Sequence, residues 1–84
     1  NNRIEIKNML KIGSGASSIV YSGIMNDKQV AIKIEKKDAS EQLENDFKTL
    51  KKLDIFKKED IIFSYPYLIM PKGVSLFNYL KPFN

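Results

Sequence analysis

Two charged side chains in apolar surroundings are the residues of this chain best suited to chemistry. Lys33 closes the segment VAIK, whose other three residues are apolar, and Asp46 lies in the later segment QLENDFKTLKKL. At about 100° per residue, Asp46 falls within the apolar face of that segment, between Leu50 and Leu53. Because an unpaired buried charge is costly, this carboxylate predicts a cation beside it, and Lys33 is the natural candidate. The plainer interpretations are a lysine that reaches water from a half-buried strand and an aspartate that stays wet at the edge of the stripe.

A glycine-containing stretch precedes the lysine. In KIGSGASSIVYSG, Gly13 and Gly15 stand one residue apart and are followed by small and hydroxylated residues. Since glycine has no Cβ, such a turn can lay backbone N–H groups over an anion, and Lys33 on a neighbouring strand can reach under it. A hairpin turn without a ligand explains the same residues. A Walker A loop is excluded, because no Gly-Lys-Ser/Thr sequence follows.

Hydrophobic periodicity predicts the elements that would position these residues. Val30, Ile32 and Ile34 alternate with Ala31 and Lys33, which is typical of a strand with two different faces. The predicted elements are strands at 4–12, 18–25 and 29–34, a helix at 39–53, strands at 61–64 and 67–70, a breaker at 71–73 and the start of a further helix at 75–80. The first three strands pair most simply as an antiparallel meander.

The helix prediction depends on a change of period. Four apolar residues recur at helical spacing on one face: Leu43, Phe47, Leu50 and Leu53. Asp38 stands three residues before Glu41, which is a variant of the capping box, and Ser40 is the competing cap.

Composition narrows the classes of function. The chain has 84 residues, no cysteine and no histidine, which excludes disulfides, thiolate metal sites and a histidine base. The net charge is +4, but the lysines form scattered pairs that are typical of solvated faces, so we expect no nucleic-acid partner. The longest apolar stretch, residues 61–70, contains Pro66 and is too short to span a bilayer. Without a signal peptide, the expected location is intracellular, in the cytoplasm, or in the host cytoplasm if the chain is viral.

Together, the segments IGSGASSIVYSG and VAIK and the following helix resemble the N-terminal lobe of a eukaryotic-type Ser/Thr protein kinase. The segment VAIKIEKKDASEQLENDFKTLKKL is most similar to the casein kinase 1 and vaccinia-related kinase group, and the resemblance covers nearly the whole chain. It implies an α+β fold in which a five-stranded antiparallel sheet packs against one helix of the αC type. It also implies ATP as the ligand.

The resemblance implies a role for each matching residue. Lys33 would bind the α- and β-phosphates of ATP, and Asp46 would hold Lys33. Met70 would be the gatekeeper, and residues 71–73 would form the hinge that meets the adenine edge. Ile12, Val20 and Ala31 would sandwich the adenine. The implied nucleotide-binding residues are Ile12, Gly13, Ser14, Gly15, Ser18, Val20, Ala31, Lys33, Met70, Lys72 and Gly73.

Several positions depart from the kinase pattern. Ser18 replaces the third glycine of the loop, and Ser17 stands where the loop tip is usually aromatic. Asp46 is one methylene shorter than the usual glutamate, so the helix must come closer or the ion pair weakens. Pro71 removes a backbone donor from the hinge, which leaves Lys72 or Gly73 to bind the adenine edge.

The sequence has neither the H-R-D-L-x-x-x-N catalytic loop nor the D-F-G motif. We therefore expect no catalytic residue and no phosphoryl transfer from this chain alone. The predicted function is the ATP-binding lobe of a Ser/Thr protein kinase that is active only when a C-lobe completes it. No metal site is expected, and magnesium would accompany ATP only with a C-lobe present.

Two other functions remain open. The chain can be a truncated, inactive kinase-like protein, of viral origin for example, that acts as a decoy or regulatory module. Its partner would be the missing C-lobe, another kinase or a regulatory protein, bound through the apolar lower face of the sheet. A basic β-sheet module that binds nucleic acid is a weaker interpretation, since the usual aromatic spacing for stacking is missing. No membrane partner is expected.

Overall fold

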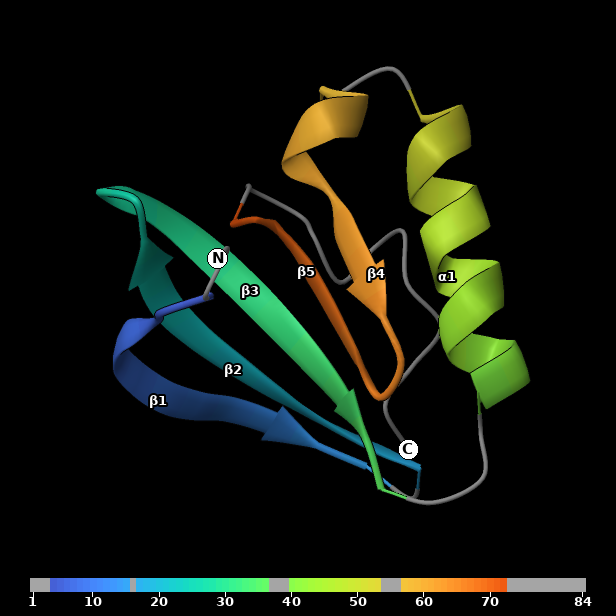
Figure 1. Cartoon of the computed structure of the whole chain (residues 1–84). Helices are drawn as coiled ribbons and strands as arrows, with labels where there is room; N and C mark the ends of the chain where they lie inside the picture. Colours follow the sequence, from blue (N-terminus) through green and yellow to red (C-terminus); the bar gives the residue numbers. More distant parts are fainter. Residues whose placement is uncertain (1–3, 16, 37–39, 54–56, 73–84) are drawn as a thin grey trace.

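The chain folds into five antiparallel strands with one longer helix beside them (Figure 1). The computed structural model describes residues 4–15, 17–36, 40–53 and 57–72. The elements are β1 (Lys7–Ser14), β2 (Ser18–Met25), β3 (Lys28–Glu35), α1 (Ser40–Lys52), the 3₁₀-helix η1 (Lys58–Asp60), β4 (Ile62–Ser64) and β5 (Tyr67–Pro71). The sheet order is β1-β2-β3-β5-β4, so β3 lies at the centre of the sheet. The α+β class and the antiparallel meander of the first three strands are confirmed.

The β2–β3 hairpin explains why the central strands keep an unbroken register. Asn26 and Asp27 both have positive φ, 53° and 64°, as the two central residues of a type I′ turn do. Asn and Asp tolerate this conformation better than other residues with a Cβ. The turn pairs Met25 with Lys28, and the pairing runs without a break to Ser18 and Glu35.

Strand β1 differs from its predicted bounds of 4–12. It begins at Lys7 and extends to Ser14, into the glycine-containing stretch. Asn8 has a φ of 58°, and the register with β2 shifts on either side of Leu10, so β1 is bulged. Ile6 lies outside the ladder, and its side chain packs against one face of the sheet.

Gly23 on β2 allows this packing. A Cβ at Gly23 would overlap Cγ2 of Ile6 and would lie 3.2 Å from the carbonyl oxygen of Lys7. We expect Gly23→Ala to lower the free energy of unfolding by about 1–3 kcal/mol, because Ile6 must move. Urea denaturation of Gly23→Ala, Ile6→Ala and the double variant checks this. In the double variant the loss should be smaller than the sum of the two single losses, and additive losses would contradict the predicted overlap.

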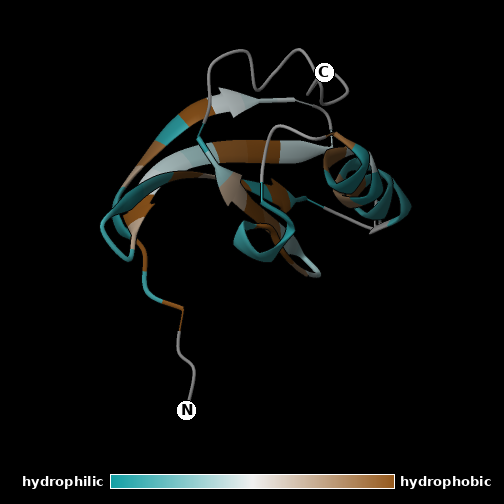
Figure 2. Ribbon diagram, turned by 90° about the horizontal axis from the view of Figure 1, so that it is seen from above, coloured by the Kyte–Doolittle hydropathy of each residue, from teal (hydrophilic) through white to brown (hydrophobic). Residues whose placement is uncertain are grey.

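The two faces of β3 bury different sets of residues. Val30 and Ile32 belong to one cluster with Ile69 of β5. Ala31 faces the other way and belongs to a second cluster that includes α1. The members of this second cluster are Ala31, Leu43, Leu50, Ile61, Leu68 and Met70, with Phe47, Leu53 and Phe63 packed against it. Figure 2 shows the strands carrying most of the hydrophobic residues, while α1 beside the sheet is largely hydrophilic.

Helix α1 packs on the sheet with the face that its periodicity predicts. Leu43 and Leu50 are fully buried, and the ring of Phe47 stacks on Phe63 of β4 with 5.2 Å between the centroids. The ammonium of Lys51 lies 5.0 Å from the centroid of the Phe47 ring and covers its outer side. The helix spans Ser40–Lys52 against a prediction of 39–53, while the predicted cap Asp38 lies outside the described residues.

The C-terminal strands are shifted slightly from their predictions. β4 begins at Ile62, after the 3₁₀-helix η1, which the sequence did not predict. β5 includes Pro71, which was expected in the hinge, because Pro71 pairs with Val30 at the end of the ladder. Gly73 and the predicted helix at 75–80 lie outside the described residues. Among the described residues, no helix has the length and apolar character that a membrane crossing requires.

Candidate functional site

Lys33 and Asp46 form a buried salt bridge between β3 and α1. The ammonium of Lys33 donates to Oδ2 of Asp46, and the two residues are only 1% and 3% exposed. The predicted pairing is confirmed. A lysine that snorkels to water and an aspartate that stays wet are therefore both wrong for this chain. The other acids of α1, Glu41 and Glu44, are exposed.

The surroundings of the pair are apolar. Lys33 pairs with Val20 of β2 on one side and with Leu68 of β5 on the other, and both neighbours are fully buried. In antiparallel strands, residues that pair directly point to the same face, so these side chains flank the ammonium. Asp46 comes from the buried face of α1. In such surroundings, each charge depends on the other for its stability.

A second acid, Glu35, lies on the same face of β3. It is 6% exposed, and neither of its carboxyl oxygens has a hydrogen-bond partner. Burial raises the pKa of Glu35 above its ordinary value of 4.5, the nearby Lys33 offsets part of this rise, and Asp46 adds to it. The hydroxyl of Ser18, which pairs with Glu35 across the β2–β3 ladder, is also fully buried without a partner. The site is therefore a cluster of one cation, two acids and one hydroxyl.

The raised pKa of Glu35 predicts a pH-dependent effect of Glu35→Gln. A carboxyl that holds its proton more tightly in the folded chain stabilises the fold at low pH, and this contribution is lost as the pH rises through the folded pKa. We therefore expect the stability of Glu35→Gln, measured relative to the unmodified chain, to be higher at pH 7 than at pH 4. Urea midpoints of both chains at the two pH values check this. A difference that stays constant or reverses with pH would contradict it.

The glycine-containing stretch forms the end of the β1–β2 hairpin. Gly13 pairs with Val20, and the Gly15 N–H donates to the Ser18 carbonyl at 2.9 Å. Among the described glycines, none has a positive φ. The backbone therefore matches a hairpin turn without a ligand, because the N–H of Gly15 already donates to Ser18. Ser14 at the end of β1 is exposed.

Lys36 fastens this hairpin to the end of β3. Its ammonium donates to the carbonyl oxygen of Gly15, and its backbone N–H donates to the Ser17 carbonyl at 2.8 Å. The sequence placed Lys36 among solvated lysines, and its side chain is exposed, but it also has this specific contact. No spacing rule in the sequence signalled it, because the contact depends on how the hairpin folds back.

Three of the four residues expected to contact adenine are closed to solvent. Val20, Ala31 and Met70 have no exposed surface, and Ile12 is half-buried. Ala31 and Met70 pair directly in the sheet and pack in the core cluster with α1. A nucleotide base can contact these side chains only after the surrounding packing opens.

The predicted hinge contact is also occupied. The N–H of Lys72 donates to the carbonyl oxygen of Gln29 at 3.0 Å, and Pro71 has no N–H to offer. Lys72 therefore cannot donate to an adenine edge while this bond is in place. The other predicted hinge donor, Gly73, lies outside the described residues.

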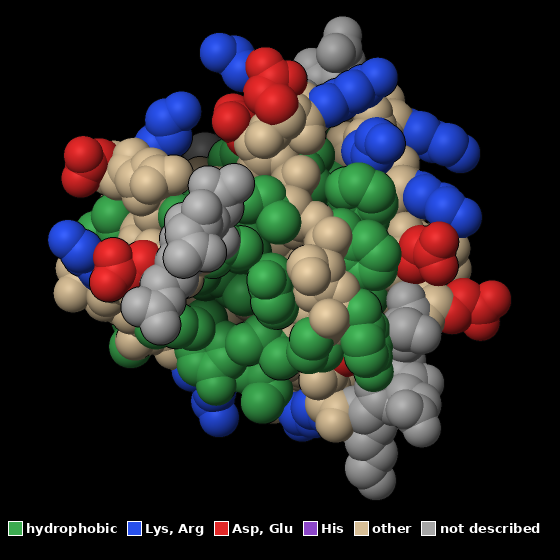
Figure 3. Space-filling model, in the orientation of Figure 1, with side chains coloured by type: hydrophobic (Ala, Val, Ile, Leu, Met, Phe, Trp, Pro, Cys, Tyr) green, Lys and Arg blue, Asp and Glu red, His purple; other side chains and the backbone are tan. Residues whose placement is uncertain are grey.

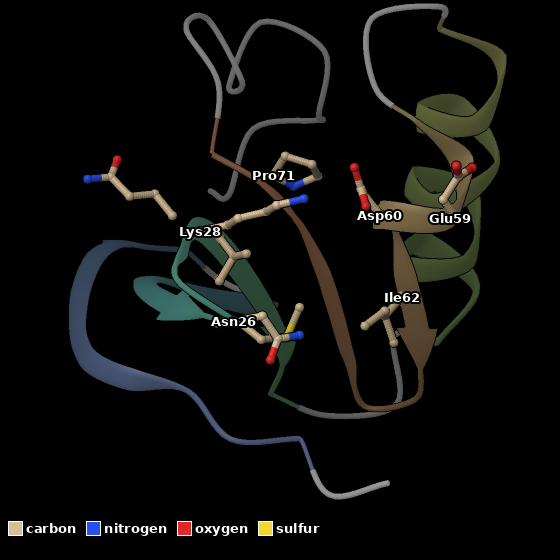
Figure 4. Close-up of a pocket in the computed structure, with 9 residues that line it drawn as sticks. Asn26, Lys28, Glu59, Asp60, Ile62 and Pro71 are labelled. Atoms are coloured by element: carbon tan, nitrogen blue, oxygen red, sulfur yellow. The ribbon is translucent and has the colours of Figure 1, made fainter.

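Two surface pockets lie away from these residues. One, of about 210 Å³, lies where the β2–β3 turn, η1 and the end of β5 meet, and Lys28 extends across it toward Asp60 (Figure 4). The other, of about 220 Å³, is apolar and opens on the sheet face opposite Lys33, between the N-terminal segment and the side chains of Ile32, Ile34 and Ile69. Pro71, in the predicted hinge, lines the first pocket, and none of the other described residues predicted to bind nucleotide lines either one.

Exposed apolar residues accompany the second pocket. Figure 3 shows hydrophobic side chains gathered over the sheet on the face that the view presents. Ile4 and Met9, which line this pocket, are 41% and 47% exposed. Leu10 is 65% exposed but pairs with Ser22 and so shares the other face, that of Ala31. The partner surface predicted from the sequence is the apolar lower face of the sheet, and this stays a prediction. On the sheet face that Lys33 shares, Leu68 and Met70 are fully buried. Within the described residues, no group of three or more acidic side chains is placed to hold a metal ion.

Comparison with known proteins does not assign this chain to a family. No protein-family model, no curated protein and no solved structure matches the chain.

Proposed function

We propose that this chain is a kinase-like ATP-binding lobe in which Lys33 binds the phosphates. The observation that carries the proposal is the buried salt bridge from Lys33 on the central strand to Asp46 on α1. Burying a lysine in an apolar strand is energetically costly. A buried lysine beside a glycine-containing hairpin is therefore a candidate for a functional charge. The resemblance of VAIK and of the hairpin to the kinase N-lobe supports the same assignment.

The residues present fit a phosphate group in part. Lys33 would supply a positive charge, Asp46 would fix the position of the ammonium, and the Ser18 hydroxyl is a buried donor without a partner. The closed packing of Ala31 and Met70 means that the base would enter only when the lower face opens. Because the sequence has no H-R-D or D-F-G motif, phosphoryl transfer would need catalytic groups from a C-lobe.

Titration of the purified chain with Mg-ATP tests this proposal. The informative variant is Lys33→Met/Asp46→Leu, which replaces the buried ion pair with an apolar pair and so preserves the fold. The matched control is Lys28→Met, which removes an exposed lysine from the same strand. We expect the unmodified chain and the control to bind alike and the double variant to bind about 10-fold or more weakly, as the loss of a charge-assisted hydrogen bond predicts. Equal or negligible binding in all three chains would contradict the proposal.

A second candidate function, a regulatory binding module, is favoured by the exposed apolar residues. Ile4 and Met9 line an open apolar pocket and are 41% and 47% exposed, and exposed apolar groups of this kind mark partner surfaces. Inhibition of a purified Ser/Thr kinase by this chain would test it. We expect Ile4→Lys/Met9→Lys to abolish such inhibition and Lys28→Met to leave it unchanged. Inhibition that survives the apolar-to-lysine changes would exclude this surface.

A further inference from the structure

The cluster around Lys33 contains hydrogen-bonding capacity that the observed arrangement leaves unused. Glu35 has two buried acceptor oxygens without a donor, and Ser18 has a buried hydroxyl without a partner. Buried polar groups in folded proteins are nearly always hydrogen-bonded, so each exception calls for an explanation. Here the two exceptions are complementary, because one is an acceptor and the other a donor.

Both groups lie close to Lys33. Ser18 and Glu35 pair directly across β2 and β3, so their side chains share a face and their Cβ atoms lie about 5 Å apart. Glu35 follows Lys33 by two residues on one strand, which places their Cβ atoms on the same face about 7 Å apart. Long side chains such as Lys and Glu span that separation. The ammonium of Lys33 also acts electrostatically on the Glu35 carboxyl.

We propose that Glu35 is a second carboxylate partner for Lys33. The ammonium can leave Asp46 and donate to Glu35, and the Ser18 hydroxyl then donates to Glu35 as well. Asp46 reaches Lys33 only while α1 lies close to the sheet, because aspartate is short. Glu35 shares a strand with Lys33, so it stays within reach wherever α1 lies. In this second arrangement, Lys33 and Ser18 both donate to Glu35, and none of the three is left without a partner.

The consequence is a positioning role for Glu35. Without it, a movement of α1 away from the sheet would take the Asp46 carboxylate away from a buried ammonium, which is strongly unfavourable. With it, the lysine has two alternative positions, one tied to the helix and one tied to its own strand. Glu35 would then set how readily Lys33 leaves Asp46.

The pKa of Glu35, followed by NMR titration of its side-chain carboxyl carbon, tests the inference. Four chains are compared: the unmodified chain, Asp46→Asn, Ser18→Ala and Asp46→Asn/Ser18→Ala. In Asp46→Asn, Glu35 gains the ammonium, so its pKa should fall by about 1 unit or more relative to the unmodified chain. Loss of the Asp46 charge alone also lowers this pKa, so the Ser18 variants provide the decisive contrast.

Ser18→Ala should leave the pKa of Glu35 unchanged in the chain with Asp46, where the hydroxyl has no partner. In the Asp46→Asn background, the same change should raise it by roughly half a unit to one unit, because a donor to the carboxylate is lost. An equal effect of Ser18→Ala in both backgrounds, or none in either, would overturn the inference. Failure of Asp46→Asn to fold would overturn it too, since Glu35 would then have failed to hold the ammonium. None of these measurements includes nucleotide, so their outcome is independent of ATP binding.

Discussion

Lys33→Met is expected to lower the free energy of unfolding by about 3–5 kcal/mol, the cost of breaking a buried ion pair by removing one partner. The variant leaves Asp46 and Glu35 buried on one face of the sheet with no cation beside them. A domain of this size has a total stability of roughly 4–13 kcal/mol, so the loss is a large fraction of the whole. Urea denaturation followed by circular dichroism measures it.

Two further variants show whether the loss comes from the pair. Lys28→Met removes an exposed lysine from the same strand and should change the stability by no more than about 0.5 kcal/mol. Lys33→Met/Asp46→Leu replaces both charges with apolar groups and should recover most of the stability that Lys33→Met loses. If Lys33→Met costs no more than Lys28→Met, the salt bridge does not organise this fold.

Leu50→Ala is expected to cost about 2–5 kcal/mol, because it opens a cavity where α1 packs on the sheet. Leu50 is fully buried in the cluster that includes Leu68 and Met70 of β5. The same side chain that fixes the helix also keeps Asp46 within reach of Lys33. We therefore expect this variant to weaken the salt bridge as well as the core.

The matched control for this prediction is Leu10→Ala on β1, where the leucine is 65% exposed. It should change the stability by no more than about 0.5 kcal/mol. Urea midpoints of the two variants, measured together, compare the same chemical change inside and outside the core. Similar midpoints would mean that α1 is not packed on the sheet as described.

Short-range patterns predicted the elements that position Lys33 and Asp46. The two-residue period of β3 placed Ala31 and Lys33 on one face, and the helical period of α1 placed Asp46 among its leucines. The pairing followed because a buried charge needs a partner, which is a rule that holds without knowledge of the fold. The same two-residue period also puts Glu35 beside Lys33, so this acid could have been identified from the sequence.

Other features depend on contacts between distant segments, which periodicity does not carry. Ile6 packs over Gly23, which is 17 positions away in the sequence, and Lys36 reaches Gly15 only after the hairpin folds back. The engagement of the Lys72 N–H by Gln29 likewise depends on where β5 meets β3. The hinge pattern in the sequence therefore identifies Lys72 as a candidate donor but does not show that its N–H already donates to another residue.

The most direct test of the central claim is the NMR signal of the Lys33 ammonium during titration with Mg-ATP. Burial and the bond to Asp46 slow its proton exchange, which makes such a signal observable. If Lys33 binds the phosphates, its side-chain nitrogen resonance should shift and saturate with Mg-ATP and remain unchanged with adenosine. A Lys33 resonance that stays fixed at millimolar Mg-ATP would contradict the assignment of this lysine as the phosphate-binding group.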